Sequence, residues 1–189
     1  MNKKELSERD IITKYIIPAI ESSGWDIQTQ FREEKGFITD GRIHVKGKKV
    51  ARGKRKRADI ILYYKPNIPV AIIEAKDNNH SVKSGIQQAL DYSNILDIPC
   101  VFSSNGDGFY FHDKTITDGE VEKEISLNNF PAPDFIWQKY KKYRGIESSE
   151  LENIVSQDFF QDATSRIPRY YQQVAINRTV EAVAKKQER

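Results

Sequence analysis

Apolar residues gather in two short runs near the middle of the chain, residues 59–64 and 69–76, with the turn-forming residues 65–68 between them. A hairpin centred between Pro66 and Asn67 pairs position i with position 133 − i. Because successive side chains of a strand point to opposite faces, both faces of this hairpin carry apolar residues. One face holds Asp59, Ile61 and Tyr63, and the other holds Ile60, Leu62 and Ile73. The pattern predicts a sheet that is covered on both sides.

The flanking residues predict helices and further strands around this hairpin. Before it, we expect a helix over residues 6–21 with a capping box from Ser7 to Asp10 and a kink at Pro18, then extended segments at 25–31 and 36–45. After it, we expect a helix from Ser81 to about Leu96, strands at 99–103 and 109–112 around a tight turn, an edge hairpin within 115–127, and helices at 134–143 and 170–186. Together these elements predict an α/β fold, with a mixed central β-sheet flanked by helices on both faces.

Length and composition narrow the class of protein. The 189 residues are enough for one ordinary domain with a piece of a second. The single cysteine, Cys100, excludes an intramolecular disulfide framework and suits a reducing compartment. The sequence has no long apolar run and does not begin like a signal peptide, so we expect a cytoplasmic protein with no membrane partner.

Charge is unevenly distributed along the chain. Nine cationic residues and no acidic residue lie between Gly41 and Ala58, and subtracting these nine from the net charge of +3 leaves −6 for the rest. The nine are Arg42, Lys46, Lys48, Lys49, Arg52, Lys54, Arg55, Lys56 and Arg57. Such a basic run is commonly a solvated, mobile loop. Its place directly before Asp59 favours a second interpretation, contact with a polyanionic substrate.

Candidate chemistry lies where the two central runs face each other. The hairpin places Asp59 opposite Glu74, with Cβ atoms about 4.5–5.5 Å apart, and puts Lys76 on the same face. Facing carboxylates repel each other, and a divalent cation between them would turn that repulsion into binding. Lys76 would orient a water, help to deprotonate it, or stabilise charge. The alternative is a pair of strand-end acids beside a solvated lysine.

Gln88 and Tyr92 form a second candidate pair. With a spacing of i and i+4 they share one face of the helix predicted from Ser81. We expect that face to point away from the helix's apolar stripe, which consists of Val82, Ile86, Ala89, Leu90 and Ser93. Both side chains can hydrogen-bond a phosphate or support the neighbouring site, although such a pair alone is typical of an ordinary exposed helix.

These residues resemble the PD-(D/E)xK nuclease superfamily. More closely, they resemble the N-terminal nuclease domain of the restriction (R) subunit of type I restriction enzymes, over residues 8 to about 145. The matching stretches are Glu8-Arg9, Ser23-Gly24-Trp25, Arg57-Ala58-Asp59, Ile72-Ile73-Glu74-Ala75-Lys76, Gln88 with Tyr92, Ser104-Asn105-Gly106, and Phe130-Pro131-Ala132-Pro133. Ala58 stands where the superfamily has proline, a departure that the type I branch tolerates.

The resemblance implies a restriction-endonuclease-like core and a set of roles. Asp59, Glu74 and the carbonyl of Ala75 would ligate Mg²⁺ or Mn²⁺, and Lys76 would be catalytic. Gln88 and Tyr92 would assist in DNA contact or cleavage. Glu8 matches an acidic residue of the first helix that reaches the metal, directly or through water.

The tail carries a second resemblance. Residues 167–176 resemble the adenine-reading Q motif that precedes the motor of superfamily 2 helicases, which implies that Gln172 recognises ATP. The sequence contains no GxxxxGK[ST] phosphate-binding loop, so we expect ATP to serve only a full-length motor. The implied organisation is an endonuclease domain over residues 1–145, followed at 146–189 by a linker and the start of a truncated motor domain.

These features favour a divalent-metal-dependent DNA endonuclease domain of a type I restriction–modification enzyme, which hydrolyses phosphodiester bonds with metal-activated water. The family implies double-stranded DNA as substrate, and methyltransferase and specificity subunits as partners. One alternative is another PD-(D/E)xK enzyme, such as a repair or junction-resolving nuclease. The other is a non-catalytic DNA-binding or assembly module, which would use the basic run without Asp59, Glu74 or Lys76.

We expect the basic run to contact DNA phosphates without reading sequence, so that affinity falls steeply with salt. Replacing Lys54, Arg55, Lys56 and Arg57 together with Gln should flatten the log–log salt dependence, by up to about 3.6 if all four contact phosphate. Anisotropy titrations of a labelled duplex at several salt concentrations measure this slope. An unchanged slope would assign the run to a solvated loop.

Overall fold

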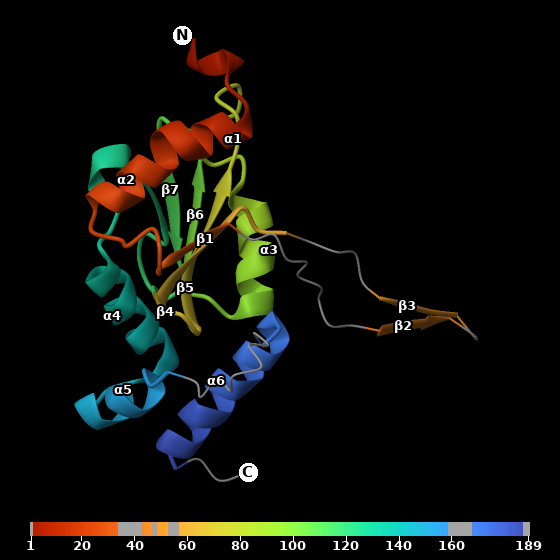
Figure 1. The fold of residues 1–189 in the computed structure, drawn as a ribbon, viewed down its shortest axis with the longest axis vertical. Coiled ribbons are helices and arrows are strands. Elements are labelled where there is room, and N and C mark those ends of the chain that lie inside the picture. Colours follow the sequence, from red (N-terminus) through yellow and green to blue (C-terminus); the bar gives the residue numbers. More distant parts are fainter. Residues whose placement is uncertain (1, 34–42, 47–48, 53–56, 159–167, 187–189) are drawn as a thin grey trace.

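The computed structural model describes residues 2–33, 43–46, 49–52, 57–158 and 168–186, with the backbone alone described at 43–46 and 49–52. Its main sheet has six strands: β1 (Phe31–Glu33), β4 (Ile60–Lys65), β5 (Ile68–Ala75), β6 (Cys100–Ser104), β7 (Gly108–Asp113) and β8 (Glu122–Ser126), which lie side by side in this order (Figure 1). β5 and β6 run parallel, and all other neighbours are antiparallel. A separate antiparallel pair is formed by β2 (Ile43–Lys46) and β3 (Lys49–Arg52). The mixed sheet confirms the predicted architecture.

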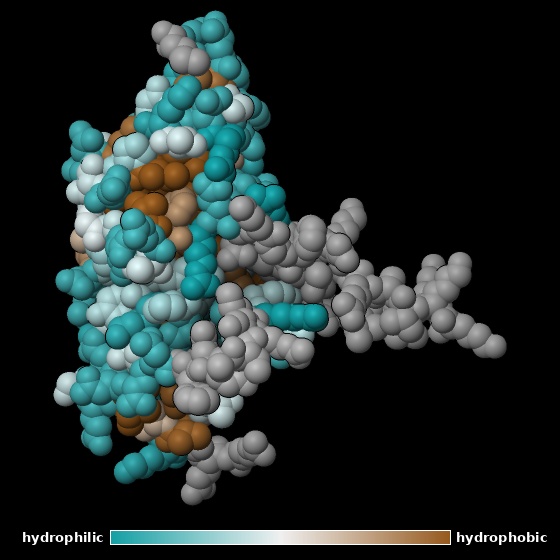
Figure 2. Space-filling model, in the orientation of Figure 1, coloured by the Kyte–Doolittle hydropathy of each residue, from teal (hydrophilic) through white to brown (hydrophobic). Residues whose placement is uncertain are grey.

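Helices cover both faces of the main sheet (Figure 1). On one side lie α1 (Glu8–Ile11), the π-helical η2 (Ile12–Ile16), α2 (Ile17–Ser22) and α4 (Pro133–Arg144), and on the other lies α3 (Ile86–Leu96). Short 3-10 turns, η1 (Lys3–Glu5) and η3 (Leu127–Asn129), and the helices α5 (Ser149–Val155) and α6 (Tyr170–Ala184) complete the described elements. Figure 2 shows one face of the molecule, which is largely hydrophilic among the coloured residues, with hydrophobic residues gathered in a few places. No described helix is long and apolar enough to cross a membrane.

The register of the central hairpin follows the sequence prediction. Ile60 pairs with Ile73 and Ile61 with Ile72, so the positions sum to 133, and the register shifts only near the turn, between Leu62 and Lys65. Ile60 and Ile73 lie in the core cluster on the α1, α2 and α4 side, while Ile61 and Ile72 lie in the cluster under α3. Two hydrophobic faces on one sheet therefore confirm the predicted double cover.

The segments before the hairpin agree with expectation only in part. Of the expected extended segment 25–31, residues 27–30 form a turn and only Phe31 lies in a strand, β1. Asp26 accepts the backbone N–H of Gln28 at 2.8 Å and the hydroxyl of Thr29 at 2.6 Å, which fixes this turn. The capping box of Ser7 with Asp10 is confirmed. Pro18 lies in the first turn of α2, directly after the π-helical η2, where its missing N–H is tolerated.

The predicted start of the next helix is also wrong. α3 begins at Ile86, and Ser81 does not cap it, because the Ser81 hydroxyl bonds to that of Ser84 at 2.8 Å. Gly85 is the N-cap instead, and the residues before it form turns. Of the predicted stripe, Ile86, Ala89, Leu90 and Ser93 do face the interior, whereas Val82 precedes the helix.

The basic run lies largely outside the described residues. The residues that the structure does not describe include Arg42, Lys48, Lys54, Arg55 and Lys56. They also include residues 36–42 of the strand expected at 36–45. Lys46 belongs to β2, and Lys49 and Arg52 belong to β3, where only the backbone is described. Arg57 is exposed just before β4. DNA contact by this run therefore stays a prediction.

A network of ion pairs ties α6 to the rest of the fold. Arg144 at the end of α4 donates to Glu181 of α6 at 2.9 Å and to Asp97, after α3, at 2.8 Å. Arg178 of α6 donates to the same two acids, at 2.9 and 2.6 Å. Only 4% of the Glu181 side chain is exposed. Its bonds to two arginines therefore balance a charge that would otherwise be costly to bury.

Candidate active site

The candidate active site lies at one end of the central hairpin, under the first turns of α3. Asp59 immediately precedes β4, Glu74 and Ala75 end β5, and Lys76 follows. The ladder pairs Ile60 with Ile73, so Asp59 and Glu74 occupy the next facing positions, as the sequence predicts. Asp59 Oδ2 accepts the backbone N–H of Ala75 at 2.9 Å. This bond across the hairpin fixes the Asp59 carboxylate beside the end of β5.

Glu74 is the most constrained of these side chains, with 2% of its side chain exposed. Its Oε1 accepts from Lys76 Nζ at 3.2 Å and from the Gln88 amide. Its Oε2 is buried and has no hydrogen-bond partner among the described residues. Burial, and then the charge of Asp59, raise the pKa of Glu74 to about 8. The protein therefore balances a charge on Glu74 only in part, so that without a cation the group binds a proton at neutral pH.

Lys76 lies between acidic groups. Its Nζ is 3.2 Å from Glu74 Oε1 and 3.7 Å from Oε1 of Glu8, which projects from α1. Burial alone would lower the pKa of Lys76, but the charges of Glu74, Glu8 and Asp59 outweigh it and raise that pKa. Lys76 therefore keeps its proton at neutral pH. The structure brings Glu8 to the site through this contact with Lys76.

Gln88 and Tyr92 are brought to the site, but not in the predicted way. Gln88 Nε2 donates to Glu74 and to the Tyr92 hydroxyl, the latter at 3.0 Å. Tyr92 is 5% exposed and packs in the core cluster under α3. The expectation that this pair points away from the apolar stripe is therefore wrong for Tyr92, whereas Gln88 is exposed as expected. α3 packs across β5 and β6, and this turns Tyr92 toward the sheet.

The donor set fits a hard divalent cation. No group of three or more His, Cys, Asp or Glu side chains converges within the described residues. An ion between Asp59 and Glu74 would therefore need backbone and solvent oxygens to complete its shell, as Mg²⁺ commonly does. The unpartnered Oε2 of Glu74 supplies an acceptor for that purpose.

Two polar residues to which the sequence assigned no role, Ser103 and Asn105, hold the loop between Lys76 and α3. The Ser103 hydroxyl donates to the carbonyl of Val82 at 2.6 Å, and the Asn105 amide donates to the carbonyl of His80 at 2.8 Å. Both follow from β6, which pairs Ser103 with Glu74. Asn105 lies in the matching stretch Ser104-Asn105-Gly106, whereas Ser103 shows in the sequence only as the end of a strand before a turn.

Gln172 does not join this site. It lies in the first turn of α6, and its side-chain oxygen accepts the backbone N–H of Arg169 at 2.9 Å, which caps the helix. Its predicted contact with ATP is not tested by this arrangement.

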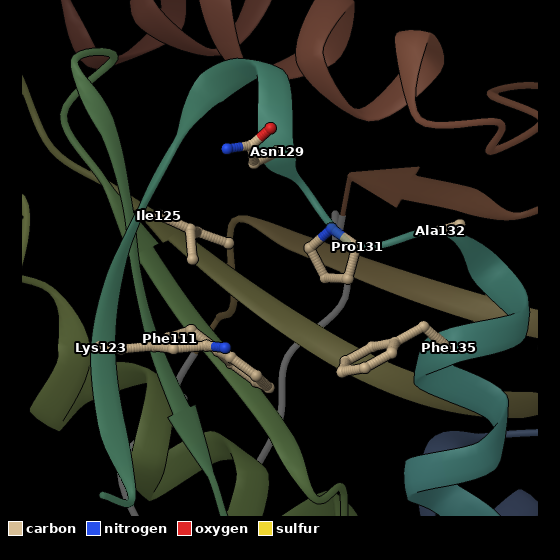
Figure 3. Close-up of a pocket in the computed structure, with 7 residues that line it drawn as sticks. All are labelled: Phe111, Lys123, Ile125, Asn129, Pro131, Ala132 and Phe135. Atoms are coloured by element: carbon tan, nitrogen blue, oxygen red, sulfur yellow. The ribbon is translucent and has the colours of Figure 1, made fainter.

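A pocket of about 280 Å³ lies elsewhere, between the β7–β8 hairpin and the start of α4 (Figure 3). It is lined by Phe111, Lys123, Ile125, Asn129, Pro131, Ala132 and Phe135. Phe111 pairs with Phe102, which belongs to the core cluster opposite α3. The pocket therefore opens on the other face of the sheet from Asp59, Glu74 and Lys76.

Comparison with known proteins identifies the family. Residues 5–120, more than half of the chain, match the model of the type I restriction enzyme R protein N terminus. The chain belongs to this family. This confirms the resemblance read from the sequence, and it disfavours a repair or junction-resolving nuclease.

Two relatives show how much of a type I R protein this chain represents. The chain is 47% identical over 190 residues to the type I restriction enzyme EcoAI endonuclease subunit of Escherichia coli. The match includes 100% of this chain and 23% of that protein. The second relative is a solved fragment of an HsdR subunit of a type I restriction enzyme from Vibrio vulnificus, which is 36% identical to this chain. The two structures superpose with a TM-score of 0.73, and the match includes 95% of this chain and 33% of the other. This agreement, with the mixed sheet, supports the restriction-endonuclease-like core. The chain spans about a third or less of the relatives it matches.

The buried Glu74 predicts how the stability of this R protein N-terminal region depends on pH. Its pKa rises from an ordinary 4.5 to about 8 on folding, so the folded state binds the proton more tightly. The stabilisation is fully present below about pH 4.5 and is lost as the pH rises through about 8. Without divalent metal, Glu74→Gln should therefore lose less stability than wild type between about pH 5 and pH 9. Urea titrations with chelator measure this difference, and parallel pH profiles would contradict it.

Proposed function

We propose that this chain is the DNA-cleaving domain of a type I restriction enzyme R subunit, and that it hydrolyses phosphodiester bonds with a divalent cation. The observation that carries the proposal is the buried Oε2 of Glu74, which lies beside Asp59 and has no hydrogen-bond partner in the part of the chain that the structure describes. A fold does not need such a pair, and replacing either acid with an apolar residue would remove the repulsion. The arrangement is useful if a cation occupies the space between the two groups.

Asp59, Glu74 and the carbonyl of Ala75 would hold Mg²⁺ or Mn²⁺. The ion, when bound, would lower the pKa of a coordinated water and neutralise charge on the phosphate. The N–H of Ala75 keeps Asp59 in place. The Gln88 amide holds Oε1 of Glu74, which leaves Oε2 for the ion.

Lys76 contributes a positive charge that stays fixed. Its raised pKa favours orientation of the attacking water or stabilisation of the developing phosphate charge over removal of a proton. Glu8 and Glu74 hold its ammonium group from two sides. Tyr92, anchored in the core under α3, keeps Gln88 directed at Glu74. Each predicted site residue in this group therefore has a place in one connected set of contacts.

Membership of the type I R protein family suggests the substrate and the partner subunits. We propose that double-stranded DNA approaches through the basic run that ends at Arg57. Methyltransferase and specificity subunits would choose the site, and ATP, with Gln172 as a candidate adenine contact, would serve only the motor of the full-length protein. The E. coli relative carries the name of an endonuclease subunit.

Lys76→Ala in the complete type I enzyme tests the proposed chemistry. Cleavage should fall roughly 100-fold or more, because the variant loses a charge next to the reacting phosphate. ATP hydrolysis should be unchanged, because Lys76 is placed in the nuclease site. Lys83→Ala is the matched control, since Lys83 is exposed and lies in the same loop region. Cleavage at the wild-type rate by Lys76→Ala would leave the non-catalytic module as the better reading.

Metal binding is tested separately by calorimetry with Mn²⁺. Glu74→Gln keeps the shape of the side chain but removes its charge, so affinity should fall about 10- to 100-fold. Glu124→Gln on β8 changes an exposed acid by the same amount and should bind as wild type does. Equal heats for wild type and Glu74→Gln would show that this pair holds no ion.

A further inference from the structure

Gly85, the N-cap of α3, has a backbone conformation that does not require glycine. Its φ of −88° and ψ of −8° are accessible to any residue. An alanine in such a compatible conformation usually stabilises a protein by restricting the unfolded chain. The reason for glycine here must therefore lie in the surrounding atoms.

Those atoms belong to the candidate metal ligand. A Cβ at position 85 would lie 2.9 Å from Glu74 Cγ, 3.2 Å from Glu74 Cβ and 3.2 Å from Ser103 Cβ. The first distance is shorter than carbon atoms in contact adopt. The backbone of Gly85 thus occupies the space directly against the Glu74 side chain, which no other residue could do without moving it.

We propose that Gly85 is a positioning residue for the Glu74 carboxylate, a role that rests on the proposed metal-dependent function. The absence of a side chain lets the first turn of α3 lie on Glu74, so that Gln88 reaches Oε1 while Oε2 stays free. The contact limits the rotation of the Glu74 side chain. Position 85 therefore requires glycine so that Oε2 of Glu74 is correctly placed, and not because the backbone makes a turn there.

Neither partner in this contact can easily retreat. Glu74 lies in β5, where every residue is buried, so its Cβ is fixed by the sheet. The segment before Gly85 is tied to β6 by the bond from Ser103 to Val82 at 2.6 Å. A methyl group at position 85 must therefore rotate Glu74 or lift α3. Either change separates Glu74 from Gln88 and alters the space between Glu74 and Asp59.

Gly85→Ala tests the proposal through Mn²⁺ affinity, measured by calorimetry on the whole chain. Affinity should fall about tenfold or more, as it does when residues that orient a ligand are changed. Ser84→Ala, an exposed neighbour, should bind as wild type does. Gly108→Ala is the steric control, because its Cβ would meet the carbonyl oxygen of Ile125 at 2.8 Å, away from Glu74. It should melt at a lower temperature yet keep its Mn²⁺ affinity. Wild-type affinity in Gly85→Ala would overturn the proposal.

A double-mutant cycle without metal tests the contact itself. If the added methyl group clashes with Glu74, the fall in melting temperature caused by Gly85→Ala should shrink when Glu74 is also changed to Ala. An equal fall in both backgrounds would place the clash elsewhere and overturn the proposal, even if Gly85→Ala alone folds poorly. If wild type binds no Mn²⁺, the proposed function fails, while the cycle still decides whether Gly85 positions Glu74.

Discussion

The site depends on one unfavourable contact, a buried carboxylate held opposite a second carboxylate. Folding brings Glu74 out of water beside Asp59 and leaves one of its oxygens without a hydrogen bond among the described residues. The surroundings offset this cost only in part, through Lys76 and Gln88. The hairpin register, the covering helix α3 and the placement of Lys76 each serve to hold this pair in place. Local strain of this kind is common where a protein binds or transforms a ligand.

The two faces of the main sheet differ in what their side chains do. On one face, isoleucines and phenylalanines of β4 to β7 pack under α1, α2 and α4 and supply most of the buried apolar surface. On the other face, α3 covers a smaller cluster, and the polar groups emerge where that cluster ends. The residues that build the core and those proposed to carry the chemistry thus alternate along the same two strands. A single-residue slip of β5 would exchange them and destroy both.

Much of this arrangement follows from the sequence because the strand period is short and regular. Alternation along 59–64 and 69–76 was enough to predict the pairing of Ile60 with Ile73 and the common face of Asp59, Glu74 and Lys76. The orientation of Tyr92 was not predictable in this way, since it depends on how α3 packs on β5 and β6. The start of α3 does not follow from the local pattern, because Ser103 and Asn105, some twenty positions further along the chain, bond to the carbonyls of Val82 and His80 in the turns before it. Tertiary contacts decided what local patterns left open.

The ion pairs of α6 have a consequence for how this region can be moved between proteins. A boundary drawn at Gly145 would separate Arg144 and Asp97 from Arg178 and Glu181. Two ion pairs cross that line, Arg144 with Glu181 and Arg178 with Asp97. In a chimera joined at Gly145, the charged residues before the junction would come from one protein and their ion-pair partners after it from another. Junctions placed beyond α6 would transfer the network intact. The unit of exchange among such proteins is therefore longer than the segment that carries the chemistry.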